Sequence, residues 1–165
     1  MPIARYAKIV MSLVLAAFCL LVTFDNITDY GTNYLFVRHV LSMDTTFPAN
    51  ELMYRSITNP VLWQIAYALI IAAEGATGVL FLVGAVRLFQ ARNASGAVFN
   101  EAKALTIAAC VLAFLVWFFG FMVVGGEYFA MWQSSTWNGQ QAAFRFYMAI
   151  LGVLIFVNQP DPDEA

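Results

Sequence analysis

The chain has 165 residues, of which 62% are hydrophobic and 11% are charged, and its mean hydropathy is +0.74. Soluble domains carry roughly 25% charged residues, so this composition excludes an ordinary soluble domain and predicts a single membrane domain over residues 1–165. A net charge of −2 without a basic stripe excludes nucleic acid as a partner.

Four apolar stretches are each long enough to cross the roughly 30 Å hydrocarbon core of a bilayer. They lie at residues 7–25, 60–89, 104–126 and 140–158, and they predict an all-α, polytopic four-helix bundle. The first stretch has the character of a secretory signal, but it is longer than a usual signal core and lacks a small-x-small site, so we expect an uncleaved helix. Asn59 followed by Pro60 predicts a capped start for the second span.

The first connection, residues 26–59, is too long for a structureless loop. Its beginning, DNITDYGTN, is rich in turn-forming residues. Tyr34, Val37 and Leu41 then recur at helical spacing, which predicts a short helix lying in the membrane interface. Asn50 is placed to cap a second short helix.

Basic side chains are more numerous at one end of the predicted bundle. The end shared by both termini and the connection at residues 90–103 carries Arg5, Lys8, Arg87, Arg92 and Lys103. The other end carries Arg38, Arg55 and Arg145. Because basic residues favour the cytoplasmic side, we predict that both termini are cytoplasmic and that the first connection faces outward. Residues 159–165 form an acidic, proline-broken tail that we expect to be loose.

Glu74 lies near the middle of the second span, where a carboxylate is costly unless it is neutral or paired. By the helical rise of 1.5 Å per residue, Glu74 lies ~20 Å and Arg145 ~18 Å above the inner boundary, so we expect a buried charge pair. The pair would either fix the register of two helices or carry protonation or ligand binding. The small residues around Glu74 predict close helix packing, or else room for a ligand beside the carboxyl group.

A second set of polar and aromatic side chains gathers at the predicted outer end. It comprises Asp25, Asn26, Asp29, Asn33, Arg38, His39, Glu127, Trp132, Gln133, Trp137, Asn138 and Gln141. Such residues are typical of a solvated rim with ordinary loop hydrogen bonds. They also form a candidate pocket for a small polar or zwitterionic ligand, roofed by the first connection.

Metal and cofactor signals are weak. A single histidine, His39, with scattered carboxylates is a thin ligand set, and a bis-histidine haem needs two histidines, so no metal and no cofactor is predicted. Cys19 and Cys110 lack CxxC spacing and are expected to be buried thiols. No GxSxG, P-loop or HExxH motif is present, so no catalytic residue is predicted.

Three stretches carry a family resemblance: TDYGTNYLFVRHVLSMDTTFP, the AAEG of the second span, and GFMVVGGEYFAMWQSSTWNGQQAAFRF. They resemble an uncharacterised bacterial family of predicted small integral membrane proteins, a domain-of-unknown-function group. The similarity covers nearly the whole chain with the same four-span layout. It implies a bacterial inner-membrane location and transfers no catalytic residue, since the family has no established activity.

Three functions remain open. The first is an accessory or interaction subunit, or a small-ligand-binding module, whose partners are the lipid bilayer and either another membrane protein or a second copy. The second is a proton-coupled transporter or oligomeric channel that uses Glu74 and Arg145. The third is an enzyme acting on a lipid or quinone, with Glu127, His39 or Asp25 as acid–base groups. The lack of catalytic motifs favours the first.

Overall fold

Pro60 begins the longest α-helix of the protein, α3, which spans Pro60–Gln90. The Asn59 side chain accepts a hydrogen bond from the backbone N–H of Val61 at 2.9 Å, so the predicted cap is confirmed. The computed structural model describes residues 2–162. Within this part, α3 is one of four helical stretches long and apolar enough to span a membrane, and the others are Ile3–Thr28, Gly96–Tyr128 and Gln140–Asn158.

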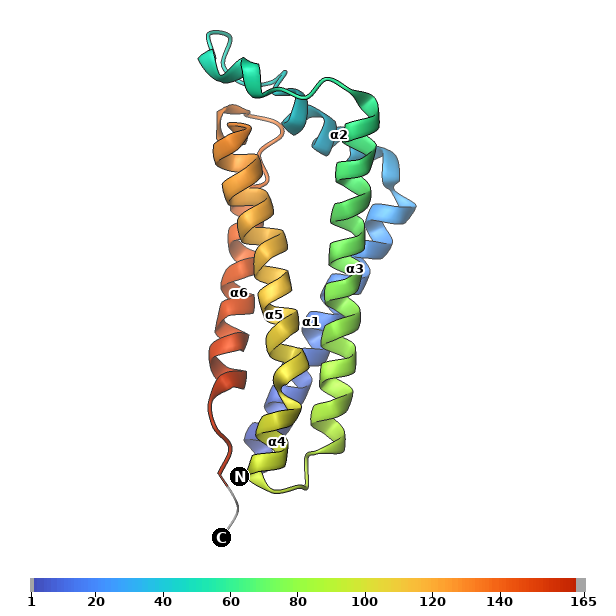
Figure 1. The fold of residues 1–165 in the computed structure, drawn as a ribbon, viewed down its shortest axis with the longest axis vertical. Coiled ribbons are helices and arrows are strands. Elements are labelled where there is room, and N and C mark those ends of the chain that lie inside the picture. Colours follow the sequence, from blue (N-terminus) through green and yellow to red (C-terminus); the bar gives the residue numbers. More distant parts are fainter. Residues whose placement is uncertain (1, 163–165) are drawn as a thin grey trace.

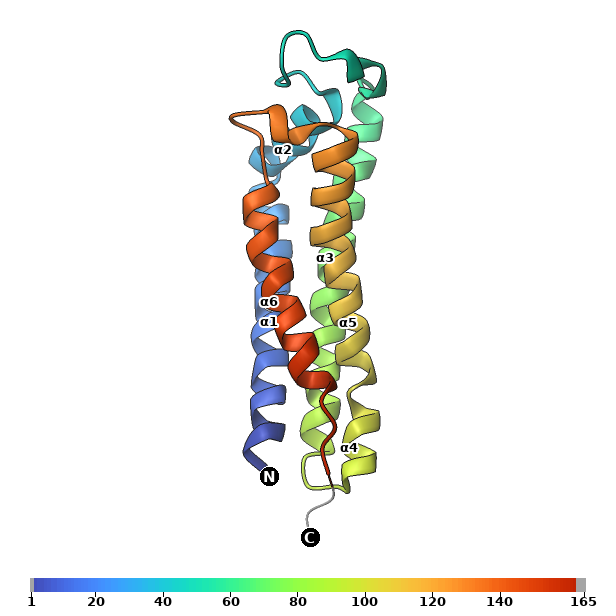
Figure 2. The ribbon, with the colours of Figure 1, turned by 90° about the vertical axis from the view of Figure 1, so that its left-hand side faces the viewer.

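The four spans run along one another as an elongated bundle, as predicted (Figure 1). α1 (Pro2–Thr28) packs mainly on α3, while α6 (Gln140–Asn158) packs on α5 (Ala104–Phe114). α3 also packs on α5, which joins the two helix pairs (Figure 2). The first and last described residues lie at the same end, here termed the terminal end, and the opposite end is termed the loop end (Figure 1). Residues 2–162 contain no strand.

The loop end begins with more helix than the sequence predicts. α1 continues to Thr28, and α2 (Tyr30–Ser42) follows after a break at Asp29 alone, so the expected turn-rich segment is wrong. Asn26 lies in this extended part of α1, where its side chain is buried and donates to Glu74. The predicted short helix is confirmed by α2, which packs on α3. The Asn50 side chain caps the single 3-10 turn η1 (Glu51–Arg55).

The third span is divided into segments, whereas the sequence predicts one continuous α-helix. α4 (Gly96–Ala102) meets α5 at Lys103, and the chain from Leu115 to Tyr128 forms a π-helix, η2. At its end the Phe129 N–H donates to the carbonyl of Val124, five residues earlier, at 3.0 Å. Most π-helical segments are single turns, and they are frequent at functional sites. A short 3-10 turn, η3 (Met131–Gln133), then leads to α6.

Glycines on α3 allow its neighbours to approach closely. A Cβ at Gly78 would lie 2.8 Å from the Leu20 side chain of α1, and one at Gly84 would lie 2.5 Å from the Thr106 hydroxyl of α5. The close-packing interpretation of the small residues is therefore confirmed at Gly78. Cys19 and Cys110 are fully buried free thiols, as expected.

Candidate functional site

Glu74 is the centre of a buried polar cluster between α1 and α3. Its side chain is 2% exposed, and its Oε2 accepts a hydrogen bond from Asn26 Nδ2 at 2.6 Å. Tyr67 lies two helical turns before Glu74 on the same face of α3. The Tyr67 hydroxyl donates to the backbone carbonyl of Asn26 at 2.9 Å, near the end of α1. The cluster therefore ties the last turns of α1 to the middle of α3.

The second carboxylate oxygen of Glu74, Oε1, has no hydrogen-bond donor among the described residues, and Glu74 lines a cavity. This oxygen is not completely enclosed by protein atoms. A cavity of about 270 Å³, here termed the carboxyl cavity, is lined by Glu74, Asn26, Asn33 and Tyr67 together with apolar and aromatic side chains. Asn33 comes from α2, and no described residue hydrogen-bonds its side chain. Two polar groups with unused hydrogen-bonding capacity therefore line this cavity.

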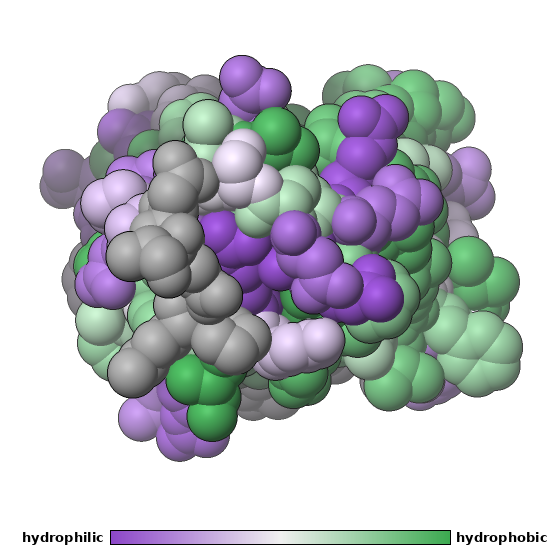
Figure 3. Space-filling model, turned by 90° about the horizontal axis from the view of Figure 1, so that it is seen from below, coloured by the Kyte–Doolittle hydropathy of each residue, from purple (hydrophilic) through white to green (hydrophobic). Residues whose placement is uncertain are grey.

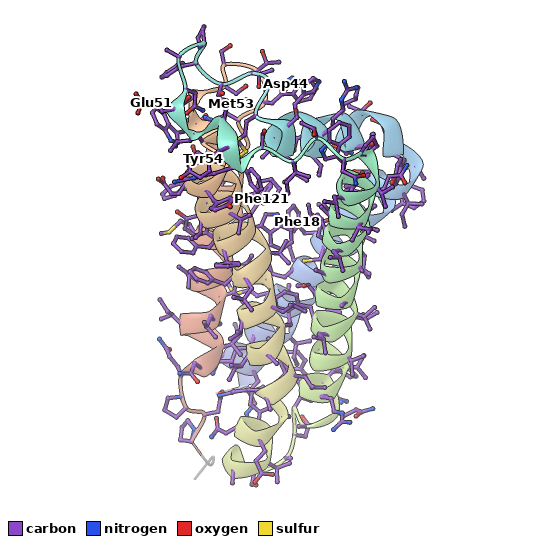
Figure 4. All side chains as sticks on the ribbon, turned by 45° about the horizontal axis from the view of Figure 1, so that its top comes forward. Phe18, Asp44, Glu51, Met53, Tyr54 and Phe121 are labelled. Carbon is purple, nitrogen blue, oxygen red and sulfur yellow. The ribbon has the colours of Figure 1, made fainter. Side chains whose placement is uncertain are left out.

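A larger cavity of about 480 Å³, here termed the apolar cavity, adjoins the first between α2, α3 and the α5–η2 helix. Every residue that lines it is apolar or glycine. The two cavities share the side chains of Phe36, Val37, Ile70 and Phe121 as walls. Figure 4 shows Phe121 projecting from η2 into the interior below the loop-end segments. The π-helix supplies one side of the apolar cavity from Leu115 to Gly125.

The predicted charge pair between Glu74 and Arg145 is not formed. Arg145 is exposed on α6, and the described residues contain no ion pair between the two. Ala143 and Tyr147, on either side of Arg145, are buried, so Arg145 points to the opposite face of the helix. The depth calculation placed the two charges at similar heights, but height does not determine the direction in which a helical side chain points.

The predicted outer pocket is also not a single site. Of its proposed members, Asn26 and Asn33 line the carboxyl cavity, and most of the others make separate contacts at the loop end. His39 Nδ1 lies 2.8 Å from Asp44 Oδ1, and the His39 ring stacks on Trp137 with centroids 4.7 Å apart. These side chains join the first connection to the connection that follows η2.

The remaining members of that set follow the same pattern. Arg38 lies over the ring of Trp63, and Trp132 packs edge-on against Phe47. Three members accept hydrogen bonds: Asp29 from the Thr32 hydroxyl, Gln133 from the Phe47 N–H and Asn138 from the Gln140 N–H. Asp25, Glu127 and Gln141 are exposed. Figure 4 places Glu51, Met53 and Tyr54 at the outer edge of this end. No group of three or more histidine, cysteine or acidic side chains suited to a metal occurs in residues 2–162.

A second polar cluster closes the terminal end. The Nζ atoms of Lys8 and Lys103 each lie 2.5 Å from Asp161 Oδ2. The Asn100 side chain also donates to the Asp161 carbonyl at 3.1 Å and accepts from its N–H at 3.0 Å. Figure 3 shows hydrophilic side chains gathered across this end, with hydrophobic ones mainly at its edge. Burial by itself would raise the pKa of Asp161, but hydrogen bonds from Lys103 and Lys8 hold that pKa below its ordinary value.

The tail was expected to be loose, and this is wrong for the residues that the structure describes. Residues 159–162 are held by the cluster, since Gln159 also accepts hydrogen bonds from Lys8 and Lys103 at 2.8 and 2.7 Å. Residues 163–165 of the predicted tail, and Met1 of the predicted domain, lie outside the described part. Sequence reasoning missed Asp161 and Tyr67. The seven-residue spacing of Tyr67 and Glu74 could have placed these two residues on one helix face.

The comparisons with known proteins agree with this architecture. The family described as "Predicted small integral membrane protein (DUF2165)" matches residues 4–160, which include the Glu74 cluster and nearly all of the four spans. No curated protein and no solved structure matches the chain. With most of its length matched, the chain belongs to this family of small integral membrane proteins, whose function is unknown.

Proposed function

We propose that the protein is a ligand-binding module of the bacterial inner membrane, in which Glu74 and Asn33 hold the polar group of a small molecule. The carrying observation is that Glu74 lines the carboxyl cavity while its Oε1 has no hydrogen-bond donor among residues 2–162. The Glu74 side chain is 2% exposed, and an acceptor on such a side chain that lacks a donor is costly in apolar surroundings. A ligand that donates a hydrogen bond to this oxygen removes the cost.

The proposed orientation follows from the distribution of basic residues. The terminal end carries most of the lysine and arginine, which favours the cytoplasmic side for that end. The carboxyl cavity would then open in the outer half of the membrane, beneath α2. The lipid bilayer is the partner that the apolar composition of the four spans requires.

The transporter alternative has less support. It used Glu74 and Arg145 as two charges on one polar route, but Arg145 is exposed on α6 and does not reach Glu74. A binding module needs only the carboxyl cavity and its polar groups. The binding proposal therefore uses fewer residues, and each of them is already in place.

Ligand-induced thermal shifts in purified protein test the proposal. A panel of small polar molecules is screened in mild detergent against wild type, Asn33→Leu, Glu74→Gln and the control Gln141→Leu, which changes an exposed residue near the same end. We expect at least one compound to stabilise wild type and the control. Its affinity should fall about tenfold in the other two variants. Asn33→Leu removes the amide, and in Glu74→Gln the single oxygen is needed by Asn26, so the ligand meets an N–H group instead of an acceptor. An absence of any shift, or equal shifts in Asn33→Leu and wild type, would refute the proposal.

A further inference from the structure

We infer that the ligand is a single-chain amphiphile, whose donor head group binds Glu74 Oε1 and Asn33 while its hydrocarbon chain fills the apolar cavity. The inference rests on the proposed function and adds the chemical class of the ligand. It depends on the contact between the two cavities, which share the walls formed by Phe36, Val37, Ile70 and Phe121.

One cavity carries polar groups and the other is lined only by apolar residues, which matches the two parts of an amphiphile. The carboxyl cavity offers one unoccupied acceptor at Glu74 and an amide at Asn33 that both donates and accepts. The apolar cavity offers no polar side chain at all. A space lined only by apolar groups excludes water and accepts apolar ligands. A purely polar ligand would occupy the first cavity and leave the second unused.

The size of the apolar cavity also favours one chain. Its volume of about 480 Å³ lies within the range of roughly 300–1,000 Å³ that is usual for small-molecule sites. The residues of α3 that line it run from Ala66 to Ala73, about two turns of helix, and Ala73 directly precedes Glu74. A chain lying along this face of α3 would therefore bring its head group to the carboxyl group.

The bilayer already dissolves hydrocarbon chains, so the chain of the ligand gains little free energy by moving from the lipid into the apolar cavity. The head group supplies the gain, because a hydroxyl or amine at the depth of Glu74 finds an acceptor that lipid tails do not provide. The inference therefore commits to a head group that donates a hydrogen bond. It predicts that an amphiphile of the same length without a donor binds poorly.

Photolabelling in lipid nanodiscs tests this directly. The probe is dodecanol with a diazirine in the middle of its chain, and the matched control probe is its methyl ether, which has the same chain and no donor. Crosslinked residues are mapped by mass spectrometry. We expect labels at Val40, Phe129 and Met131, which are buried residues that line the apolar cavity, with competition by unlabelled dodecanol and about tenfold less labelling by the ether. Dodecylamine as competitor distinguishes an amine head from a hydroxyl head.

Two variants of adjacent residues test the location of the chain. Ala73→Leu fills part of the apolar cavity, whereas Ala72→Leu adds the same bulk at an exposed position. Labelling should be lost in the first variant and kept in the second. Labels spread over exposed positions such as Val79, or equal labelling by dodecanol and its ether, would overturn the inference. If such labelling is seen but polar compounds still stabilise the protein through Asn33, the proposed function stands and only the amphiphile inference fails. If polar compounds give no such stabilisation either, the proposed function fails as well.

Discussion

Asn26 of α1 donates a hydrogen bond to Glu74 of α3 across 2.6 Å, and this bond replaces the ion pair that the sequence suggested. A neutral amide thus satisfies one oxygen of a carboxyl group inside the membrane-spanning bundle. The other oxygen accepts no hydrogen bond from residues 2–162. The hydrogen bond between Asn26 and Glu74 leads to the first prediction.

The bond between Asn26 and Glu74 should appear as a coupling energy. Asn26→Leu leaves Glu74 Oε2 without its donor, so we expect the free energy of unfolding to fall by about 1–3 kcal/mol. The variants Asn26→Leu and Glu74→Gln, combined in a double-mutant cycle in mild detergent, should couple by about 0.5–3 kcal/mol. Strict additivity of the two losses would contradict the geometry.

Arg145 provides the matched control for that cycle. Because Arg145 is exposed and makes no contact with Glu74, Arg145→Gln should change stability by no more than about 0.5 kcal/mol. Its effect should add to that of Glu74→Gln without coupling. A measured coupling between these two positions would restore the ion pair that the sequence analysis predicted.

Gly78 should tolerate no side chain. A Cβ there would lie 2.8 Å from Leu20, so Gly78→Ala is expected to destabilise the protein by about 1–3 kcal/mol through overpacking between α1 and α3. A Cβ at Gly152 in α6 would meet no other atom within 4 Å. Gly152→Ala should therefore stabilise the protein by about 0.5–1 kcal/mol through helix propensity. Thermal unfolding of both variants in one detergent makes the comparison. A destabilised Gly152→Ala with an unchanged Gly78→Ala would reverse our assignment of the packed face.

Asp161 should make stability depend on acid pH. Its pKa is lower in the folded protein than the ordinary value of 3.8, so its ionised form favours folding above that pH. The contribution is lost as the pH falls below 3.8 toward the folded pKa. At neutral pH, Asp161→Asn should cost about 1.5–3 kcal/mol, because two charged hydrogen bonds weaken.

The measurement for Asp161 is the difference in melting temperature between wild type and Asp161→Asn as the pH is lowered. This difference should be large at neutral pH and should shrink in the acid range. Glu101→Gln, which changes an exposed carboxylate of α4, is the control and should show no such trend. A difference that stays constant with pH would show that the Asp161 carboxylate contributes no charge-dependent stability.

Thr106 should be replaceable by valine. Its hydroxyl is buried against α3 and has no hydrogen-bond partner in the described part of the chain. Replacing an unsatisfied buried hydroxyl by a methyl group of similar shape is expected to be neutral or stabilising, by up to about 1 kcal/mol. Thr77→Val is the contrast, because the Thr77 hydroxyl donates to the Ala73 carbonyl at 2.7 Å. Greater loss at Thr106 than at Thr77 would contradict this reading.

The four spans could be predicted from the sequence because apolar length and helix caps are local signals. Asn59 and Pro60, for example, start α3 where expected. The partners of Glu74 could not be predicted in the same way. They depend on the rotation of α1, α3 and α6 about their own axes, which hydropathy does not determine, and so Arg145 was placed inside and Asn26 was assigned to the rim.

The tail and the π-helix show two further limits. Asp161 lies in a polar, proline-containing stretch that by composition alone is typical of a loose end, yet it binds lysines from α1 and the α4–α5 junction. Its role depends on contacts distant in sequence. In the third span, an apolar run predicts helix but does not distinguish hydrogen bonds to the fourth residue from bonds to the fifth.

The π-helix also bears on hydrophobic mismatch. The stretch Gly96–Tyr128 has 33 residues, and a straight α-helix of that number would be about 50 Å long, far beyond the roughly 30 Å of a hydrocarbon core. In η2 each backbone ring encloses one more residue than in an α-helix, so each turn holds more residues and the segment gains less height. The third span therefore fits more apolar residues into a given membrane thickness, and less of its length has to be absorbed by tilting.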